Sequence, residues 1–172
     1  MTMLSAAWEI THEAHDGQTD KSGVAYATHP ARVGAIALRL MTVDYPALMQ
    51  EVADDGFDPS SVLVVACLHD VIEDTSWSLS DLKARGISDR DCDVVEFLTR
   101  DKDAESYQRY IARIASSPMP LPLIVKRADL EDNMDPHRLS LLEDDERESL
   151  QQRYLPALGT IESALMRFRL QP

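Results

Sequence analysis

Apolar residues recur at helical spacing along most of the chain, and no stretch alternates apolar and polar residues over the length of a strand. The most strand-like run extends from Val62 to Val65. Its apolar pattern continues through Leu68 and Ile72, which makes it too long for a typical strand. The pattern therefore predicts an all-α fold, a helical bundle without internal repeats.

Capping residues and prolines divide this pattern into helices. Asp58, Ser78 and Ser88 are of helix-capping type and precede apolar segments, while Pro30 suits the first turn of a helix. Gly86 ends the short helix that Ser78 opens. The helices expected from these signals cover residues 31–41, 59–75, 79–85, 89–98, 104–115, 121–134 and 144–168.

The composition is that of a globular protein. The chain has 172 residues, of which 44% are hydrophobic and 27% charged, and we expect one domain over residues 1–172. The N-terminal segment lacks both a basic start and a long apolar stretch, so we expect no signal peptide, no membrane span and a cytoplasmic location. Cys67 and Cys92 form no Cys-x-x-Cys pair, which argues against a zinc knuckle or a disulfide framework.

The net charge restricts the partners. Its formal value is −13, which opposes the phosphate attraction that dominates nucleic-acid affinity, so a long nucleic acid is excluded as a partner class. Small anions stay compatible, because a metal ion and a few local cations can reverse the field inside one cleft.

The most informative segment ends an apolar run with four ionisable side chains within six positions, His69, Asp70, Glu73 and Asp74. Carrying unpaired charges into a core costs more than one apolar helix gains, unless a cation or a dense hydrogen-bond network takes them up. On one continuous helix, His69 and Glu73 lie one turn apart, as do Asp70 and Asp74, and the four form a compact polar patch. A bound divalent metal ion is the simplest explanation.

Two further segments offer ligands, and each also has a structural interpretation. His29 precedes a helix and can be a capping or core histidine. Asp129 lies in an apolar setting and can pair with Lys126 or Arg127, and Asn133, one turn further, is of a type common at a helix C-terminus. Their joint occurrence in one chain favours a metal site.

Together these segments resemble the HD-domain metal-dependent phosphohydrolases, specifically the hydrolase domain of RelA/SpoT-type alarmone enzymes and the single-domain small alarmone hydrolases. The similar motifs are His15-Asp-Gly-Gln18 with Lys21-Ser-Gly23, His29-Pro30, Cys67-Leu-His-Asp-Val-Ile-Glu-Asp-Thr75, and Lys126-Arg-Ala-Asp-Leu-Glu-Asp-Asn133. The resemblance runs from about residue 8 to Tyr154. It implies a bundle of the HD type and an enzyme that hydrolyses a nucleotide 3′-diphosphate, an alarmone such as ppGpp or ppApp, with release of pyrophosphate.

The resemblance also implies roles for individual residues. The metal ligands it implies are His29, His69, Asp70 and Asp129. Glu73 and Asp74 correspond to residues that orient or deprotonate the attacking water. The side chains implied to face the nucleotide and its phosphates are Lys21, Ser22, Asn133 and Tyr154. Two imidazoles and two carboxylates suit one manganese ion, our first choice, or iron(II), better than a closed structural zinc site.

The sequence departs from the family pattern at three places. Asp20 stands where the family usually has an arginine against the base, Val24-Ala25 where it often has Glu-Pro, and Pro136 where a hydroxyl residue often contacts the nucleotide. The hydrolytic centre is complete, whereas the base-reading surface differs, so the sequence leaves the base preference open.

Two other functions stay open. One is a phosphomonoesterase of the same superfamily that acts on another phosphorylated nucleotide or on a dinucleotide and releases orthophosphate. The other is a non-catalytic helical module that binds a metal ion or a nucleotide. Glu73 and Asp74 argue against the second, because binding alone requires no extra proton acceptor beside the ligands. The sequence is also compatible with a homodimer.

Overall fold

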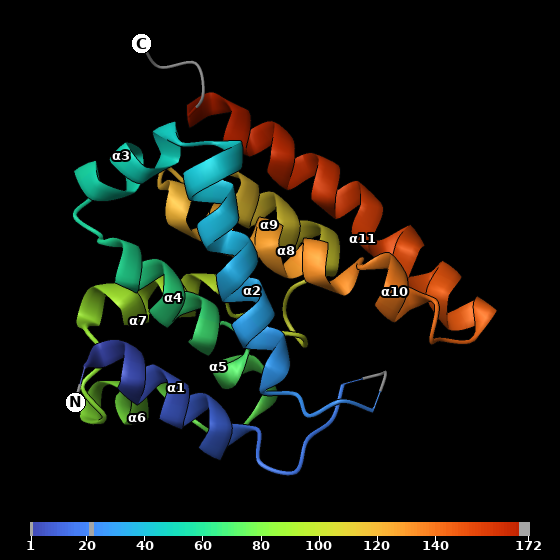
Figure 1. Ribbon diagram of the computed structural model, residues 1–172, viewed down its shortest axis with the longest axis horizontal. Helices are drawn as coiled ribbons and strands as arrows, with labels where there is room; N and C mark the ends of the chain where they lie inside the picture. Colours follow the sequence, from blue (N-terminus) through green and yellow to red (C-terminus); the bar gives the residue numbers. More distant parts are fainter. Residues whose placement is uncertain (1, 21–22, 169–172) are drawn as a thin grey trace.

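The computed structural model describes residues 2–20 and 23–168, which form helices almost throughout (Figure 1). Within these residues the backbone forms no strand, and Thr19 and Ala25 make an isolated antiparallel bridge. The predicted all-α fold is therefore confirmed. The elements are α1 (Met3–Ala14), α2 (Thr28–Arg39), the π-helical turn η1 (Leu40–Asp44), α3 (Ala47–Asp54), α4 (Pro59–Leu68), α5 (Val71–Asp74), α6 (Leu79–Ala84), α7 (Asp89–Leu98), α8 (Tyr107–Ala115), α9 (Pro120–Asn133), α10 (Pro136–Leu139), α11 (Asp144–Leu165) and the 3-10 turn η2 (Met166–Phe168).

Local capping places several helix starts where the sequence predicts them. Asp58 caps α4, where its side chain accepts hydrogen bonds from the backbone N–H groups of Ser60 and Ser61. Ser78 and Asp81 form a reciprocal capping box at the start of α6. These bonds satisfy N–H groups that the first turn of a helix otherwise leaves without a partner.

The structure corrects the prediction of one continuous helix over residues 59–75. α4 ends at Leu68, and the chain turns at His69 and Asp70 before the short α5. No proline or glycine marks this break. Instead, Nδ1 of His69 donates to the carbonyl oxygen of Ala66 at 2.8 Å, the acceptor that a continuing helix uses for the N–H of residue 70. Asp70 then has φ −105° and ψ −7°, away from regular helical values.

Other boundaries differ by a few residues. The helix expected over 31–41 becomes α2, which ends at Arg39 and continues as the π-helical turn η1. The helix expected over 104–115 begins at Tyr107, because the side chain of Ser106 caps it there. α1 and α3 are not among the expected helices, and the side chain of Thr2 caps α1 by accepting a hydrogen bond from the backbone N–H of Ser5.

α9 is the most deeply buried helix of the fold, and it packs against α2, α8 and α11. α4 packs against α1 and α2, so α2 lies between the two halves of the bundle (Figure 1). Since α9 has little contact with solvent, its charged side chains need partners inside the protein. Lys126, Asp129 and Asp132 are three such buried charged residues.

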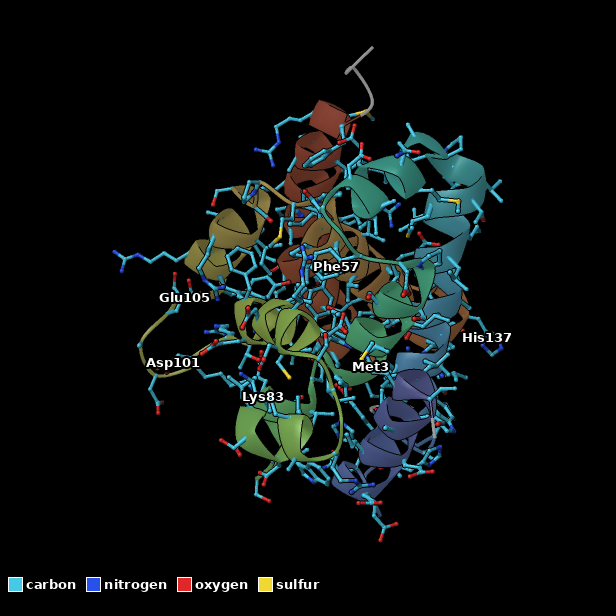
Figure 2. All side chains as sticks on the ribbon, turned by 90° about the vertical axis from the view of Figure 1, so that its left-hand side faces the viewer. Met3, Phe57, Lys83, Asp101, Glu105 and His137 are labelled. Atoms are coloured by element: carbon cyan, nitrogen blue, oxygen red, sulfur yellow. The ribbon has the colours of Figure 1, made fainter. Side chains whose placement is uncertain are left out.

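The loop between α7 and α8 projects from one side of the helical body, and Figure 2 shows Asp101 and Glu105 on it. The described helices include none that is both long enough and apolar enough to cross a membrane.

Candidate metal centre and its cavity

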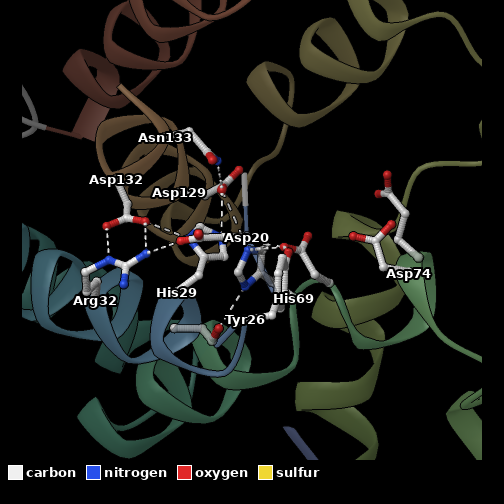
Figure 3. A network of polar contacts seen from close by, with 12 residues as sticks. Asp20, Tyr26, His29, Arg32, His69, Asp74, Asp129, Asp132 and Asn133 are labelled. Atoms are coloured by element: carbon white, nitrogen blue, oxygen red, sulfur yellow. Dashed lines mark hydrogen bonds and ion pairs between the residues drawn. The ribbon is translucent and has the colours of Figure 1, made fainter. Parts of the chain in front are cut away.

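Three parts of the fold bring the four predicted metal ligands together (Figure 3). His29 lies in the first turn of α2, His69 and Asp70 form the turn after α4, and Asp129 lies on α9. One ligand atom each of His29, His69 and Asp70 lies within 4.8 Å of the others. Oδ1 of Asp129 is 3.3 Å from Nε2 of His29 and 3.7 Å from Nε2 of His69. The four side chains therefore converge on one point.

Both histidines use Nδ1 for a hydrogen bond and direct Nε2 at that point. Nδ1 of His29 lies 2.7 Å from the Asp132 carboxylate, and Nδ1 of His69 lies 2.8 Å from the carbonyl oxygen of Ala66. Because both partners can only accept, Nδ1 carries the proton in each ring. This leaves both Nε2 atoms able to bind a metal ion, and such support of the far ring nitrogen is usual for metal-binding histidines.

The donor set fits a divalent cation. Nε2 of His69 is buried and, in the neutral ring, meets no hydrogen-bond donor among the described residues, because the groups nearest to it are carboxylate oxygens of Asp70 at 3.1 Å and Asp129 at 3.7 Å. An orphaned polar atom in the interior is costly unless a ligand satisfies it. Two imidazole nitrogens and two carboxylate oxygens match the ligand preferences of divalent transition metals. The cluster can therefore bind a metal ion.

The charges of the cluster favour positive charge at its centre. Burial alone lowers the pKa of His69, but the charge of Asp70 and a hydrogen bond with Asp129 outweigh it and raise that pKa to about 9. Burial also lowers the pKa of His29, while hydrogen bonds with the surrounding carboxylates raise it well above its ordinary value. Burial raises the pKa of Asp70, but the charge of His69 and hydrogen bonds from both histidines hold it well below its usual range. The same field favours a bound cation.

Asp129 is held by two neighbours on its own helix. Lys126 donates from Nζ to Oδ2 at 2.6 Å, and Asn133 donates from Nδ2 to Oδ1 at 2.5 Å. The sequence offered the Lys126 ion pair as an alternative to a ligand role for Asp129, and the geometry accommodates both, because the two oxygens face different partners. Burial raises the pKa of Asp129, but the charge of Lys126 and hydrogen bonds from the histidines keep it well below its usual range.

Tyr26 orients Asp70 from the other side of the cluster. Its hydroxyl donates to Oδ2 of Asp70 at 2.5 Å. The ring of His15 lies under the Tyr26 ring, with centroids 4.5 Å apart, and Nδ1 of His15 lies 2.9 Å from the side-chain oxygen of Gln18. The His15 motif therefore supports the tyrosine rather than the centre directly.

A charged network continues from His29 to the loop before α2 (Figure 3). The Asp132 carboxylate that holds His29 also accepts from Nε of Arg32 at 2.6 Å and from Nη1 of Arg138. Arg138 in turn donates to Oδ2 of Asp20 at 3.0 Å. Burial raises the pKa of Asp132, but the hydrogen bonds from His29 and Arg32 lower it to about 2, so the network keeps its charges.

Glu73 and Asp74 lie on α5, apart from the His69 turn, so the patch expected on one helix is split between two short elements. Glu73 accepts from the backbone N–H of Arg100 at 3.0 Å, and Nζ of Lys102 lies 3.3 Å from its other oxygen. Asp74 accepts from the same ammonium group at 2.6 Å. Lys102 thus bridges the two predicted catalytic carboxylates.

Three of the predicted ligands, His29, Asp70 and Asp129, line one cavity of about 350 Å³, together with Glu73, Asp74 and Lys102. His69 does not line it, but its Nε2 lies 3.1 Å from Oδ2 of Asp70, which does. Tyr154, on α11, also lines it, as does Asn133 at the end of α9. The other two residues predicted to face the substrate, Lys21 and Ser22, lie outside the described residues. The structure thus brings three of the four predicted ligands, both predicted acids, Asn133 and Tyr154 to the same cavity, with His69 in contact with the ligand Asp70.

Sequence reasoning missed the residues that support the ligands. Asp132 follows Asp129 by three residues, and Arg32 follows His29 by three, so helical spacing could have suggested both. Lys102 and Arg138 gave no comparable signal, because they approach the cavity from a loop and a separate short helix.

Comparisons with known proteins agree with this geometry. No family model matches the chain. The chain is 31% identical over 144 residues to the bifunctional (p)ppGpp synthase/hydrolase SpoT of Escherichia coli, 30% over 142 residues to a GTP pyrophosphokinase of Streptomyces coelicolor, and 29% over 138 residues to a guanosine-3′,5′-bis(diphosphate) 3′-pyrophosphohydrolase of Aquifex aeolicus. These matches cover 76–78% of this chain but 14–17% of the relatives.

A solved structure shares the fold. It is described as a metazoan ortholog of SpoT that hydrolyses ppGpp, and it matches with a TM-score of 0.66 and 21% identity over 98% of this chain and 94% of its own. The chain is therefore a homologue of one segment of the RelA/SpoT-type alarmone enzymes and has the helical fold of a SpoT ortholog, which confirms the resemblance predicted from its motifs.

Proposed function

We propose that the chain is a metal-dependent hydrolase that cleaves a nucleotide 3′-diphosphate, an alarmone such as ppGpp or ppApp, and releases pyrophosphate. The observation that carries this proposal is the convergence of His29, His69, Asp70 and Asp129 at a cavity that two further carboxylates, Glu73 and Asp74, also line. Relatives named (p)ppGpp hydrolases or pyrophosphohydrolases support the substrate class. We propose one HD-type domain over residues 1–172.

The metal ion in this proposal is one manganese ion, with iron(II) as the alternative. His29 and His69 would hold it through Nε2, and Asp70 and Asp129 through carboxylate oxygens. When bound there, a divalent cation would supply Lewis acidity toward water and compensate negative charge on phosphoryl oxygens. Mixed nitrogen and oxygen donors suit manganese or iron.

Glu73 is the proposed proton acceptor, with Asp74 beside it. The backbone N–H of Arg100 holds one oxygen of Glu73, and Lys102 holds Asp74 and lies near the other oxygen of Glu73. Burial lowers the pKa of Lys102, but the hydrogen bond and charge of Asp74 raise it overall, so the bridging ammonium keeps its proton. The bridge fixes both carboxylates at the cavity wall.

Substrate contacts are proposed for Lys21, Ser22, Asn133 and Tyr154. Asn133 already donates to Asp129, so its first role is to position that ligand. Asp20 replaces the arginine expected against the base, and its carboxylate is engaged by Arg138. Base recognition in this chain therefore differs from that of the family, and we leave the base to experiment. A cytoplasmic location and a homodimer also remain predictions.

The test is product analysis with manganese-loaded protein and guanosine or adenosine alarmones. Pyrophosphate as the product supports the proposal, and orthophosphate favours the phosphomonoesterase, which the Asp20 replacement makes the second candidate. The Glu73→Gln variant should keep its metal content and lose about 10²–10⁴-fold in kcat, the usual contribution of a general base. Glu96→Gln, an exposed acid on α7, is the matched control. Equal rates for Glu73→Gln and the parent contradict the role of Glu73.

A further inference from the structure

Two arginines meet at one tyrosine on the side of the cavity formed by α8 and α11. Cζ of Arg153, on α11, lies 4.5 Å from the ring centroid of Tyr107, the first residue of α8. Cζ of Arg100, just after α7, lies 5.9 Å from the same centroid. All three residues line the cavity that contains the metal cluster. We call them the Tyr107 site.

The charge balance of the cavity singles out these two arginines. Its other described cations are neutralised: Lys102 by Glu73 and Asp74, Lys126 by Asp129, and Arg138 by Asp20 and Asp132. Among the described residues, by contrast, neither arginine of the Tyr107 site has a carboxylate within ion-pair distance. The guanidinium group of Arg100 makes one hydrogen bond to a described residue, from Nε to the backbone carbonyl oxygen of Glu105 at 2.9 Å.

An unpaired pair of guanidinium groups is unusual in a chain with a net charge of −13. Acidic side chains that could neutralise the two groups are abundant in this protein, yet none of the described acids of the cavity lies within ion-pair distance of either guanidinium group. Guanidinium groups pair readily with phosphate, because their planar N–H donors match two phosphate oxygens at once. The local field at the Tyr107 site therefore favours a phosphate-bearing ligand.

A row of contacts joins the Tyr107 site to the metal cluster. From Asp129 the path runs 2.6 Å to Nζ of Lys126, which lies 4.9 Å from the ring centroid of Tyr110. The Tyr110 and Tyr107 centroids are a further 6.1 Å apart. Tyr154 lies beside Tyr107 with its centroid 6.1 Å away. Among the described residues, no hydrogen bond or ion pair joins Arg100, Tyr107 or Arg153 to the four predicted metal ligands, so the Tyr107 site offers a second set of anion contacts in the same cavity.

The tyrosine ring holds the arginines ready for an anion. A cation over an aromatic face is attracted by the ring. Because this contact already restrains Arg153, the side chain loses less conformational entropy when an anion binds. Burial raises the pKa of Tyr107 to about 12, so the ring stays uncharged and does not compete with a phosphate.

We propose that Arg100, Tyr107 and Arg153 bind a second phosphate group of the substrate, on the side of the cavity formed by α8 and α11. The substrate class is then a nucleoside phosphorylated at two positions, with the hydrolysed group at the metal cluster and the 5′-phosphates at the Tyr107 site. This inference rests on the proposed function for its catalytic consequence, but the binding site itself can be tested without turnover.

The first experiment measures binding of guanosine 5′-diphosphate and guanosine to the full chain by calorimetry. Arg153→Gln should lower the affinity for guanosine 5′-diphosphate by roughly 10-fold, the loss expected for one charged hydrogen-bonded contact. The affinity for guanosine should stay unchanged. Arg109→Gln is the matched control, because Arg109 is an exposed arginine on α8 that does not line the cavity. Thermal unfolding of each variant checks the fold.

The second experiment compares kinetics for ppGpp and for guanosine 3′-diphosphate, which lacks the 5′-phosphates. Arg153→Gln should raise KM for ppGpp by roughly 10-fold with kcat unchanged, and should leave KM for guanosine 3′-diphosphate unchanged. Equal diphosphate affinity in Arg153→Gln and the parent overturns the Tyr107 site, whatever the turnover. Diphosphate binding that depends on Arg153, without turnover of any alarmone, supports the site and overturns the proposed function instead.

Discussion

Replacing Asp132 with asparagine tests how strongly metal binding depends on the carboxylate behind His29. The substitution keeps the size of the side chain and removes its negative charge. Asp132 is not a proposed ligand, so the donor set itself stays complete. What changes is the acceptor that holds Nδ1 of His29 at 2.7 Å and thereby directs Nε2 at the cluster.

The structure allows the size of the effect to be worked out. Carboxylates that hold a metal-binding histidine are typically worth about 10–100-fold in metal affinity, or about 1.4–2.8 kcal/mol. Asp132 also accepts from Arg32 at 2.6 Å and from Arg138, and it is almost completely buried. An amide cannot satisfy all these donors. We therefore also expect the unfolding free energy of the metal-free protein to fall by about 1.5–3 kcal/mol.

The assay is calorimetric titration of metal-free protein with manganese, together with chemical unfolding of the same samples. Glu131→Gln provides the matched control. It removes a negative charge from the same helix, where Glu131 pairs with Arg39 and Arg127 at the surface, away from the histidines. The control should bind manganese within about twofold of the parent, because surface ion pairs contribute little.

One result refutes the reasoning. If Asp132→Asn folds and binds manganese as tightly as Glu131→Gln, the carboxylate does not orient His29, and the network in Figure 3 is only structural. A weaker affinity in both variants to the same extent assigns the effect to overall charge rather than to the hydrogen bond.

Three further predictions concern the cluster itself. Asp70→Asn should reduce bound manganese, measured by elemental analysis, to less than about a tenth of the parent value, and unchanged metal content contradicts its ligand role. Tyr26→Phe removes the hydroxyl that donates to Asp70 and should lower the affinity for manganese by about 2–10-fold. An unchanged Kd shows that this hydrogen bond does not support the ligand. His69 has a folded pKa of about 9, above its ordinary 6.5, so the stability that its proton contributes to the metal-free protein is complete below about pH 6.5 and lost as the pH rises through 9. Manganese competes with that proton, so its affinity should rise over the same interval, and calorimetry at pH 7 in two buffers of different ionisation heat should detect about one to two released protons. Absence of proton release contradicts the raised pKa.

The helices were predictable because their signals are local. Asp58 and Ser78 cap helices by bonding to backbone groups two or three residues away, so these starts depend on neighbouring sequence alone. The break after Leu68 was not predictable in this way. No helix-breaking residue occurs there, and the turn depends on the His69 side chain taking the carbonyl of Ala66.

The ligand set was predictable from residue types and motif spacing, whereas its supporting residues were not. Histidines and carboxylates placed in apolar segments already require a partner, whatever the fold. Whether Asp132 faces His29, and whether Arg138 reaches Asp20, depends on the crossing of α2 and α9 and on the path of α10. Helical spacing can place Asp132 on the same side of α9 as Asp129, but the contacts with His29 and Asp20 do not follow from the order of residues.

The amino-acid sequence by itself determined that the chain is helical, where most helices begin, and which histidines and aspartates could share a metal ion. Only the tertiary structure decided that Glu73 and Asp74 stand on a separate short helix under Lys102, and that Arg100 and Arg153 meet at Tyr107 without an acidic partner among the described residues. The physical reason is range. Helix propensity and capping act over a few residues, whereas the direction of a charged side chain is set by residues far away in the sequence that the packed helices bring beside it.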